Sequence, residues 1–83
     1  MTTEEREALK LKADIICEIL ENRKEQGLTQ KQLEEASGVK QPIIARLENG
    51  ITDPRLTTLL KVLRPLGKTL KIVPIEETVH GGV

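Results

Sequence analysis

Three side chains in one short stretch, Gln41, Ile43 and Arg46, are of types that recognise DNA bases. A Gln amide can form two hydrogen bonds with adenine, an Arg guanidinium can form two with guanine, and an aliphatic side chain can contact the methyl group of thymine. Such contacts require an element that fits the major groove. We therefore predict that Gln41 and Arg46 read bases, and the surrounding sequence must supply the helix that carries them.

Catalytic or metal-binding chemistry has few candidate residues. The single histidine, His80, and the single cysteine, Cys17, lie far apart, and no metal-ligand spacing or paired acid and base is present. Cys17 lies in a helical pattern without a nearby histidine, so we interpret it as a small packed hydrophobe rather than a reactive thiol. The sequence predicts a protein that is not an enzyme and binds no metal or cofactor.

The composition limits the fold to one small domain. A chain of 83 residues supports one modest core, which must be aliphatic because there is no Phe, Trp or Tyr. The 13 basic and 13 acidic residues cancel, although residues 1–26 carry seven acidic groups against five basic ones. A single cysteine excludes an internal disulfide, and no signal peptide or membrane-spanning apolar run is present, so we expect a cytoplasmic location.

The helix that carries the candidate base readers is expected at residues 41–49. Ile44 and Leu47 have the spacing of core-facing positions, and Gly50 closes the helix. Pro42 lies in the first turn, where its missing amide proton would have no intrahelical partner in any case. One face of this helix is thus left free for a ligand.

A shorter helix is predicted immediately before it. Thr29 and Gln32 have the spacing of an N-terminal capping box, so this helix begins at Gln30. Gly38 suits a turn with positive φ that redirects the chain into the next helix. The two elements together predict a helix-turn-helix over residues 30–49.

Two further helical patterns flank this pair. Apolar residues at helical spacing predict a long first helix from Thr3 to Gln26, whose charged early part, 4–12, is expected to fray or project unless something docks on it. A fourth amphipathic helix is predicted from Leu56 onward, ending before Gly67. Pro65 is expected to kink this helix or end it early. The predicted fold class is therefore mainly all-α, a bundle of about four helices over residues 1–67.

The last regular pattern predicts a β-strand. Residues 69–75 alternate and are rich in β-branched side chains. A lone strand has unpaired backbone groups, which the same strand of a second subunit would pair across a two-fold axis. We predict a homodimer joined through residues 68–76 and an unstructured tail at 77–83. The strand residues expected at the dimer contact are Leu70, Ile72, Val73 and Ile75.

The sequence also resembles a known family. Residues 28–50 read LTQKQLEEASGVKQPIIARLENG, which resembles the helix-turn-helix of the Cro and lambda-repressor (XRE) family. The continuation ITDPRLTTLLKVLRPLGKTLKIVPIEE is similar to the shorter antitoxins of HigA type and, more distantly, of HipB type. The resemblance implies a DNA-binding repressor whose third helix enters the major groove. It implies base contacts at Gln41, Pro42, Ile43 and Arg46.

Contacts with DNA phosphates are implied by the same resemblance. The family places them at the start of the second helix and near the end of the third, at positions that match Gln30 and Asn49. Lys31 and Lys40 would add positive charge beside these contacts. For each lysine taken alone, a solvated surface residue is an equally good interpretation.

The resemblance also implies an internal ion pair, and the sequence departs from the family pattern at two positions. Arg23 and Glu48 occupy positions at which lambda-type repressors tie the first helix to the third. Lys40 stands where the family usually has a Ser-like helix cap, and a phosphate contact would offset the lost cap. Glu34 stands where the family prefers Ala, so the angle between the second and third helices remains open.

Three functions remain open on the sequence. The leading one is an antitoxin that represses its own operon as a dimer and neutralises a ribonuclease toxin of RelE-like (HigB) type. The second is a stand-alone phage-like or housekeeping repressor whose strand serves only for dimerisation. The third is an adaptor that binds other proteins and no DNA, because the zero net charge does not favour a nucleic-acid ligand.

Overall fold

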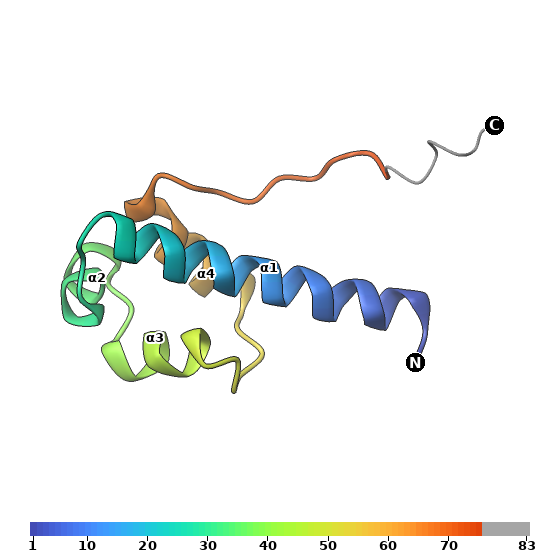
Figure 1. The fold of residues 1–83 in the computed structure, drawn as a ribbon, viewed down its shortest axis with the longest axis horizontal. Coiled ribbons are helices and arrows are strands. Elements are labelled where there is room, and N and C mark those ends of the chain that lie inside the picture. The colour runs from blue at the N-terminus through green and yellow to red at the C-terminus, as the bar shows by residue number, and fades with distance from the viewer. Residues whose placement is uncertain (76–83) are drawn as a thin grey trace.

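The computed structural model describes residues 1–75, which form four α-helices and one short 3₁₀ turn. The helix-turn-helix lies in the middle of the chain, between a long first helix and a short last one. Figure 1 shows the first helix running across the bundle, with the third helix on one side of it and an extended C-terminal segment on the other. The elements are α1 (Thr3–Glu25), α2 (Gln30–Ser37), α3 (Gln41–Glu48), α4 (Leu56–Leu63) and η1 (Arg64–Leu66).

Capping boxes fix where two of the helices begin. At the start of α2, the Gln32 N–H donates to the Thr29 hydroxyl at 3.0 Å, and the Thr29 N–H donates to the Gln32 side chain at 2.8 Å. Thr2 and Glu5 form the same reciprocal pair at the start of α1. The capping box of α2 was predicted from the sequence. The capping box of α1 was not, and it fixes the start of that helix at its first turn.

The turn between α2 and α3 depends on a glycine. Gly38 ends α2 with φ at 79°, and its N–H donates to the Glu34 carbonyl at 2.8 Å. A residue with a side chain rarely adopts this left-handed conformation, so glycine permits the turn without strain. The turn brings the start of α3 back toward α2, as the sequence predicted.

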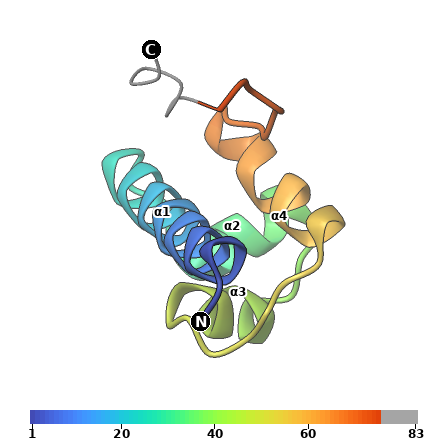
Figure 2. The same ribbon diagram turned by 90° about the vertical axis from the view of Figure 1, so that its right-hand side faces the viewer.

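The core lies where the four helices meet, and it is wholly aliphatic. Figure 2 shows α1, α3 and α4 arranged around this centre, with α2 crossing behind it. Each helix contributes at least one buried side chain, so the short helices α2, α3 and α4 depend on one another and on α1 for stability. The most deeply buried residues are Ile19, Leu33, Ile44, Leu47 and Val62.

Pro65 ends α4 instead of kinking it. The α-helix stops at Leu63, and the chain continues as the 3₁₀ turn η1 because proline has no N–H to donate along an α-helix. This tighter turn places Leu66 in the core, where it is almost fully buried. Gly67 then leaves the turn with φ at 81°.

The first part of α1 extends beyond the bundle as a helical arm. Figure 1 shows this arm leading to the N-terminus without a neighbouring helix. Leu9 and Leu11 are 56% and 55% exposed, whereas Ile19, farther along the same helix, is fully buried. Of the two predicted outcomes, fraying and projection, the structure shows projection.

The predicted strand does not form within the described residues. Residues 68–75 run as an extended segment, and residues 1–75 contain no strand. Leu70 packs against the core, whereas Ile72 and Val73 are 98% and 61% exposed. A strand requires a hydrogen-bonded neighbour, so pairing of residues 68–76 between two subunits remains a prediction. The predicted tail at 77–83 lies outside the described residues.

Candidate nucleic-acid interface

The outward side of α3 consists of residues spaced one and two helical turns apart. Pro42, Arg46 and Asn49 share this side at spacings of four and three residues, opposite the buried Ile44. All three are exposed, and Ile43 beside them is 47% exposed. The structure therefore brings Pro42, Ile43 and Arg46 to one accessible surface.

Gln41 lies on a different flank of α3, at its border with α2. It is half-buried, and its side-chain amide donates a long hydrogen bond of 3.5 Å to the Gln30 side chain. Gln41 is the first residue of α3, so it lies near the helix end predicted to enter a groove. The two predicted base readers thus differ in accessibility. Arg46 is exposed, whereas Gln41 is half-buried and hydrogen-bonded to the Gln30 side chain.

Arg23 and Glu48 join α1 to the end of α3 through a two-pronged ion pair. Arg23 Nε lies 2.7 Å from Glu48 Oε2, and Arg23 Nη2 lies 3.0 Å from Oε1. Only 13% of the Arg23 side chain and 4% of the Glu48 side chain are exposed. Arg23 Nη1 also donates to the Leu28 carbonyl at 2.9 Å, so the same guanidinium holds the turn before α2.

A hydrogen-bonded chain links this ion pair to the candidate base reader. The Gln30 amide donates to Glu48 Oε1 at 2.8 Å, and its oxygen accepts from Gln41. The chain therefore begins in α1 at Arg23 and passes to Glu48 at the end of α3. From there it continues to Gln30 in α2 and returns to the start of α3 at Gln41. The last link, at 3.5 Å, is the weakest of the chain, so it favours one orientation of Gln41 without fixing it.

Gln30 has a role that the sequence did not reveal. Its resemblance to family positions implied a phosphate contact, but both polar ends of its side chain are engaged inside the protein. The structure places Gln30 as the link between Glu48 and Gln41. A phosphate contact at Gln30 stays a prediction, as it does for Asn49, Lys31 and Lys40, which are all exposed.

Glu34 provides the helix cap that Lys40 lacks. Lys40 makes no side-chain cap to α3, but Glu34 Oε1 accepts from the Gln41 N–H at 3.3 Å. A carboxylate at a helix N-terminus is also favoured by the helix dipole. Lys31 Nζ and Lys40 Nζ lie 3.4 Å and 4.0 Å from the Glu34 carboxylate. The two departures from the family therefore compensate each other.

Replacing Glu34 with alanine should lower the free energy of unfolding by about 1 kcal/mol, the usual effect of losing an N-terminal cap. Adding Lys40→Ser, which restores a capping hydroxyl, should recover most of that loss. Urea denaturation of the two variants and the unchanged chain measures both effects. A Glu34→Ala chain that equals or exceeds the unchanged chain in stability would show that this carboxylate does not cap α3.

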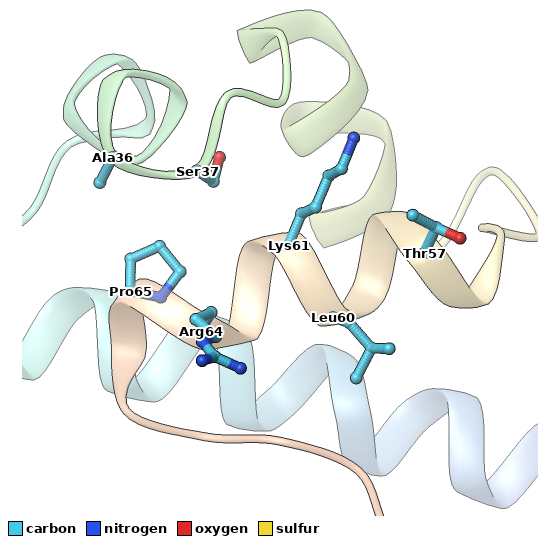
Figure 3. Close-up of a pocket in the computed structure, with 7 residues that line it drawn as sticks. All are labelled: Ala36, Ser37, Thr57, Leu60, Lys61, Arg64 and Pro65. Carbon is cyan, nitrogen blue, oxygen red and sulfur yellow. The ribbon is translucent and has the colours of Figure 1, made fainter.

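An open hollow lies away from the outward side of α3. It has a volume of about 410 Å³, and none of the candidate base-reading residues lines it. Figure 3 shows Lys61 and Pro65 directed toward the side on which α2 lies, and Leu60 directed away from it. The hollow is therefore separate from the candidate interface. Its lining consists of Ala36, Ser37, Thr57, Leu60, Lys61, Arg64 and Pro65.

Residues 1–75 offer little for other kinds of site. No group of three or more His, Cys, Asp or Glu side chains in this part of the chain is placed to hold a metal ion. None of the helices described is both long and apolar enough to cross a membrane. The surface of α2 and α3 remains the best-formed candidate site.

Comparison with known proteins assigns the same region to a described family. Residues 19–73 match the model of a family described as helix-turn-helix. A protein of Haemophilus influenzae, described as an uncharacterised HTH-type transcriptional regulator, is 58% identical over 65 residues, which cover 78% of this chain and 66% of that protein. This chain thus spans just under two thirds of that relative. A Sinorhizobium fredii protein with the same kind of description is 36% identical over 61 residues, or 71% of this chain and 79% of that protein.

A solved structure is similar over almost the whole chain. It is a chain of a toxin-antitoxin module from Streptococcus pneumoniae, 51% identical in sequence, with a TM-score of 0.80. The similarity covers 92% of this chain and 84% of that chain. The helical fold described above is therefore the fold of a solved protein.

Proposed function

This chain belongs to the helix-turn-helix family, and we propose that it is a cytoplasmic transcriptional repressor that inserts α3 into the major groove of its operator. The observation that carries this proposal is the outward side of α3. Arg46 and Ile43 are exposed there, while the opposite side of the same helix is buried in the core. A rigid helix with a free polar side fits the dimensions of the major groove.

Each side chain of the surface has a proposed role. Arg46 forms two hydrogen bonds with a guanine, Gln41 forms two with an adenine, and Ile43 and Pro42 contact thymine methyl groups. The phosphates on either side hold α3 in register through residues at the ends of α2 and α3. These proposed phosphate contacts are Gln30, Lys31, Lys40 and Asn49.

Arg46→Ala is expected to weaken binding to the cognate operator by about 1 to 3 kcal/mol and to relax the preference at one base pair. Lys31→Ala should weaken binding to operator and random DNA alike, because a phosphate contact carries no sequence information. Fluorescence anisotropy with labelled duplexes from upstream of the gene for this chain measures both variants. Equal losses on operator and random DNA for Arg46→Ala would contradict its role as a base reader.

The adaptor alternative is tested by the same titrations. A repressor that contacts several phosphates should lose operator affinity steeply as salt is raised from 50 to 200 mM. An adaptor that binds no DNA would give no anisotropy change with any duplex at the lower salt. That result would overturn the proposal for α3.

We propose that the repressor acts as a homodimer through the extended C-terminal segment. Several apolar side chains beside this segment are exposed in the single chain, among them Leu56 and Ile72. They border an open hollow of about 420 Å³ that a second copy would cover. Two copies related by a two-fold axis can present their α3 helices to half-sites one helical turn apart. The lining residues are Leu56, Leu60, Leu70, Lys71 and Ile72.

The finer proposal is that the repressor is an antitoxin. The similarity to a chain of a toxin-antitoxin module supports it. The partner proposed is a RelE-like ribonuclease of HigB type, a choice that rests on the resemblance of the sequence to HigA-type antitoxins. The test is co-expression with the product of the neighbouring reading frame, followed by size-exclusion chromatography. Co-elution and relief of growth arrest are expected of an antitoxin. Separate elution would contradict the antitoxin proposal and favour the stand-alone repressor, whose operator binding is measured independently by the titrations above.

A further inference from the structure

The apolar side of α1 continues outward beyond the core. Ile19 is fully buried, and Ile15, Leu11 and Ala8 follow at spacings of four, four and three residues along the same side of the helix. Exposure rises along this row, because Ile15 is half-buried while Leu11 and Ala8 are exposed. The row therefore extends from the core onto the projecting arm.

The arm is nevertheless built as a stable helix. Its first turn is held by the capping box of Thr2 and Glu5, and Lys10 and Asp14 form an ion pair at 3.1 Å along it. A projecting helix gains little stability in water from its own hydrogen bonds, so exposed helices usually depend on packing of their apolar side. A partner that covers Leu11 and Ala8 would supply that packing.

A row of carboxylates runs beside this apolar side. Six acidic residues follow each other at helical spacing, interrupted once by Leu11, so they lie along one flank of α1. All six are exposed. Within residues 1–75, only Asp14 and Glu18 of this row form an ion pair, with Lys10 and Lys68. The row consists of Glu4, Glu7, Asp14, Glu18, Glu21 and Glu25.

This acidic flank is turned away from α3. Glu18 reaches Lys68 at 3.7 Å, at the start of the extended segment, whereas Lys12 and Arg23 on the other flank contact Asp53 and Glu48. Figure 2 shows the extended segment and α3 on opposite sides of the molecule. A ligand on the acidic flank would therefore leave the outward side of α3 accessible.

A hollow of about 330 Å³ lies between the acidic flank and the extended segment. Its apolar lining is Leu11, Ile15, Leu63 and Leu70, and its polar lining is Asp14, Glu18, Lys68 and Thr69, of which Lys68 is paired with Glu18. An apolar centre with a charged edge is the usual arrangement of a protein-protein contact.

We infer that a cationic protein, the toxin of the proposed pair, docks on this part of α1, and this inference rests on the proposed antitoxin function. A nuclease that binds RNA needs positive charge, which complements the carboxylates, and its apolar side chains cover Leu11 and Ile15. The α1 docking face is defined as Leu11 and Ile15 with Glu4, Glu7, Asp14 and Glu18.

A second copy of the chain does not fit the α1 docking face. A two-fold interface places the same surface of each subunit against itself, so the carboxylates of one copy would face the carboxylates of the other. Like charges brought together in this way oppose association. The face therefore selects a different protein of opposite charge.

The test compares two variants that each replace two charged side chains with neutral ones, on opposite sides of the same helix. Glu7→Gln with Glu18→Gln removes two charges from the α1 docking face, and Arg6→Gln with Lys24→Gln removes two from the far side. The probe is the purified product of the neighbouring reading frame, and surface plasmon resonance gives its Kd. The first variant, and separately Leu11→Gln, should bind about tenfold more weakly, while the control should stay within about twofold.

Two further measurements separate the outcomes. Circular dichroism and operator affinity should be unchanged in all variants, which excludes loss of the fold. Equal Kd values for the face and control variants would overturn the docking face while leaving the antitoxin function intact. No binding by the unchanged chain would overturn both. Conversion of a dimer to a monomer by the face variants, seen in sedimentation, would assign the face to a second copy and also overturn the inference.

Discussion

Replacing Glu48 with alanine should lower the free energy of unfolding by about 3 to 5 kcal/mol, because it leaves the Arg23 guanidinium largely buried without its counter-ion. Glu48 accepts from Arg23 twice and from Gln30 once, so three hydrogen bonds are lost together. For a domain of this size, each kcal/mol corresponds to about 4 to 8 °C in melting temperature. Thermal and urea denaturation measure the change.

Two matched variants show whether burial causes this effect. Asp14→Ala breaks the exposed pair with Lys10, and it should cost at most about 0.5 kcal/mol. Arg23→Met combined with Glu48→Leu removes both charges of the buried pair, and it should recover most of the stability lost by Glu48→Ala. Equal costs for Glu48→Ala and Asp14→Ala would show that the buried pair does not hold α1 to α3.

A chain that ends at Lys71 should sediment as a monomer and bind its operator about 10² to 10⁴-fold more weakly. The truncation keeps Leu70, which packs against the core, and removes the exposed Ile72 and Val73. A monomer reads one half-site at a time and loses the effective concentration that joins the two binding events. Analytical ultracentrifugation and operator titrations give both quantities.

The control for this truncation is a substitution in the intact chain. Val73→Pro removes one backbone N–H and should weaken any strand pairing without shortening the protein. Circular dichroism of both variants should show unchanged helix content, because the described helices end before residue 67. A truncated chain that remained a tight dimer would place the interface on the helices.

Local sequence signals were enough to predict most of the fold. The Thr29 and Gln32 capping box placed the start of α2 correctly, and Gly38 marked the turn before α3. Both signals act through hydrogen bonds of the backbone with a side chain or a carbonyl only a few residues away, so the sequence alone shows them directly. The end of α4 was harder to predict, because a late proline is compatible with a kink or an end, and only the structure shows that the helix ends at Leu63.

Contacts between distant residues could be predicted only in part. The resemblance to lambda-type repressors paired Arg23 with Glu48, but nothing local showed that Gln30 joins that pair to Gln41. Glu34 left the angle between α2 and α3 open in the sequence, and no local signal showed that it caps α3 from seven residues away. Such contacts depend on the angle between helices, which no spacing in the sequence specifies.

The hydrogen-bonded chain that ends at Gln41 divides the proposed DNA-reading positions of α3 into two classes during evolution. Ile43 and Arg46 are exposed and contribute little to the core, so substitutions there cost little stability. If they read bases as proposed, a lineage can change its target sequence at these positions one substitution at a time. Gln41 is tied through Gln30 to Glu48, so altering it perturbs a network that also holds the protein together. Divergence in target preference among descendants of this protein should therefore begin at the free positions.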